Sequence, residues 1–306
     1  LSSSMIQVSE WSVLLLLLKL ASYSALAALA GTFLIRFIIA SNLSGHHFIS
    51  FSQYLKRWQI QCVALGFIAV ILQVPIEAGA IAESGVAGML DPFMQEIVWQ
   101  SVIGEQALFR GAALFVAMIV ALNWRINIKH RFAVVINNTV MLVLLISIAY
   151  SFTFTGHSAN ENGLVKSMLT FHLLAIASWV GSLWPLYKSC TILSVHEVKK
   201  VMHLFGHLAI IVVFVLLISG LALLLNYLHS LSALFTSSYG QLILLKLLLV
   251  SAMLMMGAWH KLILVPRITQ KQHVGTLKRS ISVEMLIAAF VLITTSVFTT
   301  LVGPPN

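Results

Sequence analysis

Residues 208–225 have the sequence LAIIVVFVLLISGLALLL, an apolar run without a charged residue. The apolar character extends over 200–228, and about 20 apolar residues in an α-helix suffice to cross the hydrocarbon core of a bilayer. A strand of a membrane barrel would instead alternate apolar and polar residues with period two over about ten residues. The stretch therefore predicts a transmembrane helix.

Seven further apolar runs follow the same pattern along the chain of 306 residues. Together they predict eight spans, near 11–40, 57–80, 104–124, 132–155, 164–187, 200–228, 239–263 and 281–302. In the first run, apolar residues continue past SALAALAG to Ile39 and no Lys or Arg precedes them, so we expect a retained span rather than a cleaved signal peptide. The predicted fold is all-α, a polytopic transmembrane helical bundle that forms one integral membrane domain over 1–306.

The composition agrees with membrane insertion. Hydrophobic residues make up 59% of the chain and charged residues 9%, against about 25% charged residues in a typical soluble domain. The net charge of +9 would suggest nucleic acid as a partner of a soluble protein. Here the Lys and Arg residues lie in short clusters between apolar runs, as membrane topology requires, so we expect contact with lipids and not with nucleic acid.

The basic residues also predict an orientation. They lie in alternate connections, at Lys56 and Arg57, at Arg125, Lys129 and Arg131, at Lys188, Lys199 and Lys200, and at Arg267, Lys271, Lys278 and Arg279. Residues 1–10, 81–103, 156–163, 229–238 and 303–306 contain neither Lys nor Arg. Because positive loops stay in the cytoplasm, we expect both termini in the periplasm and the chain in the bacterial inner membrane.

The outer connection 81–103 is acidic, with Glu83, Asp91 and Glu96. Asp91 followed by Pro92 is typical of a helix start and predicts a short interfacial helix. Two interpretations stay open, a solvated acidic loop and a mouth that collects cations.

Ionisable residues inside spans are costly unless they are paired or hydrated, so each is a candidate functional residue. By depth, the outer half contains Lys19, Glu77, Glu105, Arg110, His172 and Lys246, and the cytoplasmic half contains Arg36, His203, His207, His260 and Glu284. The three outer cations Lys19, Arg110 and Lys246 have Glu77 and Glu105 as candidate partners in a buried salt network. Binding of an anionic substrate or a lipid head group is the alternative.

The fifth span carries the most informative pattern. Met168, His172, Ala175 and Trp179 follow at steps of four, three and four, which places them on one helical face that we expect to point into the bundle. A thioether and an imidazole one turn apart suit copper, and His157 lies just outside the start of this helix. The alternative is that His172 hydrogen-bonds a neighbouring helix and Met168 fills packing space.

Histidines on different spans also allow haem b. Pairs such as His172 with His207, or with His203 on the same helix face as His207, would make the chain an electron-transfer protein such as a cupric or quinone-linked reductase. Cys62 and Cys190 lie near the cytoplasmic face and are candidates for a soft Cu(I) exit site or for simple packing. A Walker loop and a phosphorylatable aspartate motif are both absent from the sequence, so we expect a transporter or metal-handling protein rather than an ATP-driven enzyme.

Several motifs together resemble the CopD/PcoD copper-resistance family of bacterial inner-membrane proteins. They are GEQALFRG at 104–111, GHSANENGLVKSMLTFHLLAIASWVGSLWPL at 156–186, SGLALLL at 219–225, YGQLILLKLLLV at 239–250, LVPRI at 264–268 and SVEMLIAAFVLITTSVFTTLVGPP at 282–305. The resemblance is clearest from about residue 100 onwards and weaker in the first two spans.

The resemblance implies copper resistance or copper transport, with copper received from the periplasm and a separate CopC-like copper-binding protein as partner. The family pattern matches His157, His172 and Trp179, and its Arg, Lys and Glu positions match Arg110, Lys246 and Glu284. Met168, His203 and His207 have no place in that pattern. A scaffold that docks a periplasmic chaperone without transporting copper is a further hypothesis.

Overall fold

The computed structural model describes residues 10–40, 42–124, 131–227, 235 and 238–301. These residues form helices and connections without a strand. The helices are α1 (Glu10–Ala40), α2 (Gly45–Ala82), α3 (Val86–Leu90), α4 (Pro92–Trp99), α5 (Val102–Leu122), α6 (Arg131–Ser151), α7 (Gly163–Ile192), α8 (Val195–Tyr227), α10 (Ser238–Trp259) and α11 (Lys271–Leu301), with a short 3₁₀ turn η1 (Gly156–Ser158) and a π-helical turn η2 (His260–Leu264).

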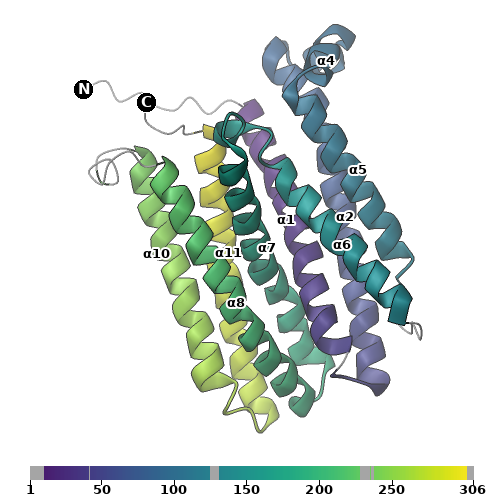
Figure 1. Cartoon of the computed structure of the whole chain (residues 1–306), viewed down its shortest axis with the longest axis vertical. Helices are drawn as coiled ribbons and strands as arrows, with labels where there is room; N and C mark the ends of the chain where they lie inside the picture. The colour runs from purple at the N-terminus through teal and green to yellow at the C-terminus, as the bar shows by residue number, and fades with distance from the viewer. Residues whose placement is uncertain (1–9, 41, 125–130, 228–234, 236–237, 302–306) are drawn as a thin grey trace.

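Eight of these helices are long and apolar enough to cross a membrane, which confirms the predicted number of spans. The start of α1 and the end of α11 lie at the same end of the bundle, as an even number of spans requires (Figure 1). The side of the membrane that this end faces stays a prediction of the charge pattern.

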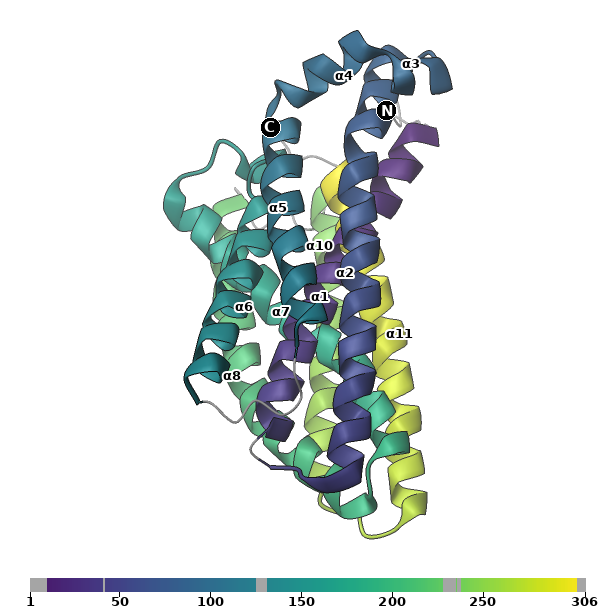
Figure 2. The same ribbon diagram turned by 90° about the vertical axis from the view of Figure 1, so that its right-hand side faces the viewer.

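The bundle is built around α1 and α7. Helices α2, α5 and α6 pack on one side of this pair and α8, α10 and α11 on the other (Figures 1 and 2). Two apolar cores follow this division, one around Leu26, Leu114 and Met141 and one around Leu183, Leu277 and Ile281. The side chains of α8 and α10 that face away from the bundle are large and apolar, for example Phe214 and Leu248, as lipid contact requires.

Several helices are longer than the spans predicted from hydropathy. Helix α2 has 38 residues and α8 has 33, whereas about 20 residues cross the hydrocarbon core. The added turns lie at the ends predicted to be cytoplasmic, so Lys56, Lys188 and Lys199 belong to helices and not to loops. A span predicted from hydropathy ends at the first charged residues, whereas the helix itself continues as long as its backbone hydrogen bonds do.

The connection between α2 and α5, which is predicted to lie outside, contains the short helix predicted from the sequence. Asp91 Oδ1 accepts hydrogen bonds from the backbone N–H groups of Phe93 at 2.8 Å and Met94 at 3.4 Å, and Pro92 occupies the first turn. This is the N-cap arrangement that satisfies free backbone donors at a helix start. The sequence-based prediction for Asp91 and Pro92 is therefore confirmed, with α4 as the helix that they begin.

The two central helices cross at glycines. A Cβ atom on Gly181 of α7 would clash with the carbonyl oxygen of Ala27, and one on Gly31 of α1 would clash with the backbone of Gly181. Small residues allow such direct backbone contact between transmembrane helices, where packing replaces the hydrophobic effect as the main source of association. This crossing fixes α1 against α7 next to the site described below.

Candidate functional site

His172 lies on α7 and points towards α8. Its Nδ1 atom is 3.3 Å from Oγ of Ser219, and the Ser219 hydroxyl also contacts the backbone oxygen of Val215 at 2.6 Å. The next residue on α8 is Gly220, where an added Cβ would lie 3.1 Å from Cε1 of His172. The motif SGLALLL therefore supplies both a polar partner and the space that the imidazole occupies.

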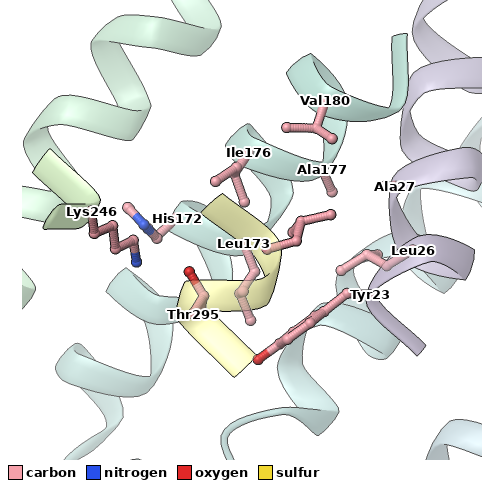
Figure 3. Close-up of a pocket in the computed structure, with 11 residues that line it drawn as sticks. Tyr23, Leu26, Ala27, His172, Leu173, Ile176, Ala177, Val180, Lys246 and Thr295 are labelled. Carbon is pink, nitrogen blue, oxygen red and sulfur yellow. The ribbon is translucent and has the colours of Figure 1, made fainter. Parts of the chain in front are cut away.

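A cavity of about 30 Å³ opens beside His172 between α1, α7, α10 and α11. Its walls are apolar except at one end, where His172, Lys246, Thr295 and Tyr23 contribute polar atoms (Figure 3). The cavity is large enough for a water molecule or a single ion. The expectation that the stripe of α7 points into the bundle agrees with this position, since Ala175 and Trp179 are buried and His172 lines the cavity.

Lys246 sets the electrostatics of this cavity. Its side chain comes from α10 and extends towards His172 (Figure 3). Two basic side chains from different helices thus meet at this end of the cavity. A positively charged Lys246 side chain repels cations from this cavity.

The donor set beside His172 is sparse. The described residues contain no group of three or more His, Cys, Asp or Glu side chains that could hold a metal ion. Met168 lies one turn before His172 and is half-buried. The backbone of His157 is in η1, and its side chain lies outside the described residues. The ligand roles of His157, His172 and Met168 therefore stay predictions.

A second polar cluster lies further along the same helix interface. Trp179 Nε1 donates a hydrogen bond of 3.0 Å to Glu284 Oε1, and His260 Nδ1 forms an ion-pair contact of 3.2 Å with Glu284 Oε2. The other ring nitrogen of His260 is 2.7 Å from Oγ of Ser280. Trp179 and Glu284 are 5% and 1% exposed, so this carboxyl group is fully enclosed by protein. We call these four residues the inner cluster.

Arg110, one of the cations predicted to lie in the outer half of the membrane, contacts residues that its depth in the membrane does not indicate. Arg110 Nε donates to Ser151 Oγ at 2.8 Å, and its guanidinium lies 3.9 Å from the ring centroid of Phe152. Glu105 is exposed on α5. Arg110 of α5 thus contacts the hydroxyl of the last residue of α6 and the ring of the residue that follows it. Lys19 of α1 interacts electrostatically with Glu77 of α2.

The second set of histidines lies elsewhere. His203 and His207 are exposed on α8, with ring centroids 4.7 Å apart. Ser219, the partner of His172, follows His207 by 12 residues, which corresponds to about 18 Å along the helix axis. Two axial ligands must reach the same iron. Because His172 contacts Ser219, its ring lies far along α8 from His207, and the predicted pairing of these two imidazoles is not formed in this structure.

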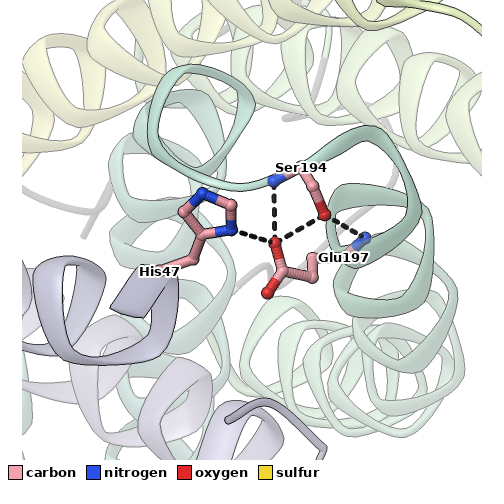
Figure 4. Close-up of polar contacts among 3 residues, drawn as sticks. All are labelled: His47, Ser194 and Glu197. Carbon is pink, nitrogen blue, oxygen red and sulfur yellow. Dashed lines mark hydrogen bonds and ion pairs between the residues drawn. The ribbon is translucent and has the colours of Figure 1, made fainter. Parts of the chain in front are cut away.

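Both cysteines are free thiols, and a role as a Cu(I) exit site stays a prediction. Cys62 is buried, and Cys190 Sγ contacts the backbone oxygen of Leu186 at 3.5 Å. At the same end of the bundle, His47 Nδ1 pairs with Glu197 Oε2 at 2.9 Å, and Glu197 also accepts from the backbone and hydroxyl groups of Ser194 (Figure 4). This contact joins the start of α2 to the start of α8 and was missed because no motif links the two segments.

Fold and site together define a multi-pass helical membrane protein with an interhelical cavity that contains an imidazole. Residues 5–167 match the family model described as Copper resistance protein D-like, N-terminal domain, and residues 199–298 match Copper resistance protein D. The chain belongs to the copper resistance protein D family.

A curated relative gives the same assignment. Copper transport protein CutJ of Bacillus subtilis (strain 168) is 32% identical over 254 residues, which is 79% of this chain and 45% of the relative. The chain thus spans less than half the length of this relative. The search of solved structures found no match.

Proposed function

We propose that the chain transports copper across the bacterial inner membrane and receives it from the periplasmic side at His172. The observation that carries this proposal is an imidazole inside the bundle that lines a cavity between four helices. An ionisable side chain in a membrane interior is costly without a function. Family membership and the likeness to a protein named for copper transport support copper as the cargo.

The residues around His172 fit a transient copper ligand. The Ser219 hydroxyl contacts Nδ1 of the ring, and we propose Nε2 as the atom that binds the metal. Met168 on the same helix face and His157 at the entrance are the further donors that we propose, because thioether and imidazole groups are the soft ligands that Cu(I) accepts. A CopC-like periplasmic protein is the proposed donor of copper.

Copper accumulation in cells tests this proposal. The chain is expressed in a bacterium that lacks its own copper-uptake proteins, and cellular copper is measured by mass spectrometry. We expect accumulation to rise with the wild-type chain and to fall to the level of the empty vector with His172→Ala. His203→Ala is the matched control, because His203 is exposed on α8 and away from the cavity.

Equal accumulation in His172→Ala and wild-type cells, at equal protein levels in the membrane, would remove His172 from the transport path. If the wild-type chain raises neither copper content nor copper sensitivity, copper transport itself is wrong. A visible spectrum of the purified protein tests the haem alternative, because haem b gives a Soret band.

A further inference from the structure

The inner cluster contains a carboxyl group that the proposed copper site does not use. Glu284 is 1% exposed, and each of its oxygens has a separate partner, Trp179 Nε1 on one side and His260 Nδ1 on the other. A buried carboxylate without a compensating charge is strongly unfavourable. Glu284 and His260 can remain together as a neutral pair only if the two groups share one titratable proton.

The geometry points to a role for that proton. Nδ1 of His260 faces the carboxyl group, and Nε2 faces the Ser280 hydroxyl at 2.7 Å. Carboxyl, imidazole and hydroxyl groups thus form a continuous hydrogen-bonded chain, and each group can both give and accept a proton. Ser280 lies next to Arg279 and Lys278, at the end of α11 that is predicted to face the cytoplasm. A proton can therefore pass between Glu284 and that side.

The backbone around His260 is unusual as well. The π-helical turn η2 begins at this residue, and the N–H of Val265 donates to the carbonyl oxygen of His260 at 2.9 Å. Single π-helical turns within α-helices are frequent at functional sites, because they change the direction of the side chains around them. Here the turn lies where α10 brings His260 against α11.

Other charged groups on the surrounding helices have different partners. Lys261 Nζ donates to the carbonyl oxygen of Gly206 at 3.0 Å, and Lys199 Nζ donates to that of Pro266 at 3.0 Å. Arg36 of α1 lies over the Trp124 ring. Lys188 and Lys278 lie over aromatic rings, and Cys190 contacts Leu186. His203 and His207 are exposed. Lys246 lines the cavity beside His172. Among the described residues, His260 is the one ion-pair partner of Glu284.

The inner cluster and the cavity beside His172 both contain residues of α7. Trp179 follows His172 by seven residues on α7, about 10 Å along the axis. Helix α11 also contributes to both sites, and η2, which carries His260, directly follows α10, which carries Lys246. Loss of the shared proton leaves this interface with one net negative charge, which favours entry of a cation at the same interface. Return of the proton restores neutrality and favours release of the cation.

We propose that Glu284 and His260 bind and release a proton in exchange for copper, so that the chain acts as a copper–proton exchanger. This inference rests on the proposed function. When copper enters from the outer side, the O–H or N–H bond of the shared proton breaks and the proton leaves towards that side through the His172 cavity. The next proton arrives from the cytoplasmic side through the Ser280 hydroxyl as copper is released, and the copper ion keeps its oxidation state throughout. Copper and protons then cross the membrane in opposite directions.

Proteoliposomes test this proposal. The purified chain is reconstituted with a pH-sensitive dye inside the vesicles, and Cu(I) kept reduced with ascorbate is added outside. For the wild-type chain we expect the internal pH to rise as copper enters. Glu284→Gln keeps the size of the side chain and an acceptor for Trp179 but cannot release a proton, and we expect its proton flux to fall at least tenfold. The control Glu105→Gln changes an exposed residue and keeps the wild-type proton flux.

The possible outcomes separate the two proposals. Copper entry into wild-type vesicles without a pH change, or with acidification, overturns the exchange and leaves copper transport intact. A wild-type chain that moves no copper overturns both. If Glu284→Gln does not fold, His260→Gln takes its place, because it removes the proton acceptor while the carboxyl group remains. A variant of either residue that transports copper with wild-type proton flux also overturns the exchange.

Discussion

Trp179 and Glu284 are 105 residues apart in the chain and are joined by a hydrogen bond of 3.0 Å between Nε1 and Oε1. This bond connects α7 to α11 in the part of the bundle that is shielded from water. A hydrogen bond between transmembrane helices contributes on average about 0.6 kcal/mol and at most about 1.7 kcal/mol. The bond to Glu284 belongs at the upper end of this range because its acceptor is a carboxyl group.

We therefore expect Trp179→Phe to lower the stability of the protein in detergent by about 1–1.7 kcal/mol more than the loss of ring volume alone. Trp58→Phe is the matched control, because Trp58 Nε1 is buried without a hydrogen-bond partner among the described residues. The same aromatic volume is lost in both variants, but a bond is lost only at Trp179. Thermal unfolding in one detergent is the measurement, and equal shifts in the two variants would contradict the assignment.

The crossing of α1 and α7 predicts a second effect. In Gly181→Ala the new methyl group meets the carbonyl oxygen of Ala27, so α1 and α7 must separate, at a cost of about 1–3 kcal/mol or more. Gly275→Ala on α11 meets no atom within 4 Å, and we expect it to be neutral or to stabilise the helix by up to about 1 kcal/mol. Similar unfolding temperatures for the two alanine variants would show that the crossing is looser than described.

Space beside His172 gives a third prediction. A methyl group in Gly220→Ala would lie 3.1 Å from the imidazole and would displace the ring from Ser219. We expect copper transport to fall several-fold while the amount of folded protein in the membrane stays unchanged. Gly206→Ala on the same helix meets only the Lys261 side chain, at 3.4 Å or more, and should transport copper normally. The measurement is the copper transport rate of both variants at equal expression. A normal rate in Gly220→Ala would argue that the position of the His172 ring does not affect transport.

The orientation is tested by cysteine labelling in intact cells. In a chain with Cys62 and Cys190 replaced by Ser, a single cysteine is introduced at Ser84, before α3, or at Lys271, at the start of α11; both positions are exposed. We expect an impermeant thiol reagent to label Ser84→Cys from outside and Lys271→Cys only after the cells are opened. The reverse pattern would invert the topology and the proposed direction of copper entry.

The number of spans and the N-cap of α4 could be predicted because both depend on local sequence. Apolar length determines which segments cross the membrane, and the pair Asp91–Pro92 determines where α4 begins. The first turns of α2 could not be predicted in this way. They start at Gly45, and the segment SFSQYLKRWQ at 50–59 is too polar to register as a span.

The contacts within the inner cluster could not be predicted from the sequence. Depth along each span places His260 and Glu284 in the same half of the membrane, but contact depends on the rotation of each helix about its axis. The π-helical turn at His260 changes that rotation, and the sequence carries no signal for it. For the same reason depth suggested Glu105 as a partner of Arg110, whereas the guanidinium contacts Ser151 and Phe152. The face of α7 could be predicted because its residues lie on one helix.

The most direct test of the account is radioactive copper uptake by the purified chain in proteoliposomes, with the wild-type protein compared with His172→Ala. We expect time-dependent uptake with the wild-type chain and uptake no greater than that of protein-free vesicles with the variant. Equal uptake by both proteins would contradict a copper path through the His172 cavity.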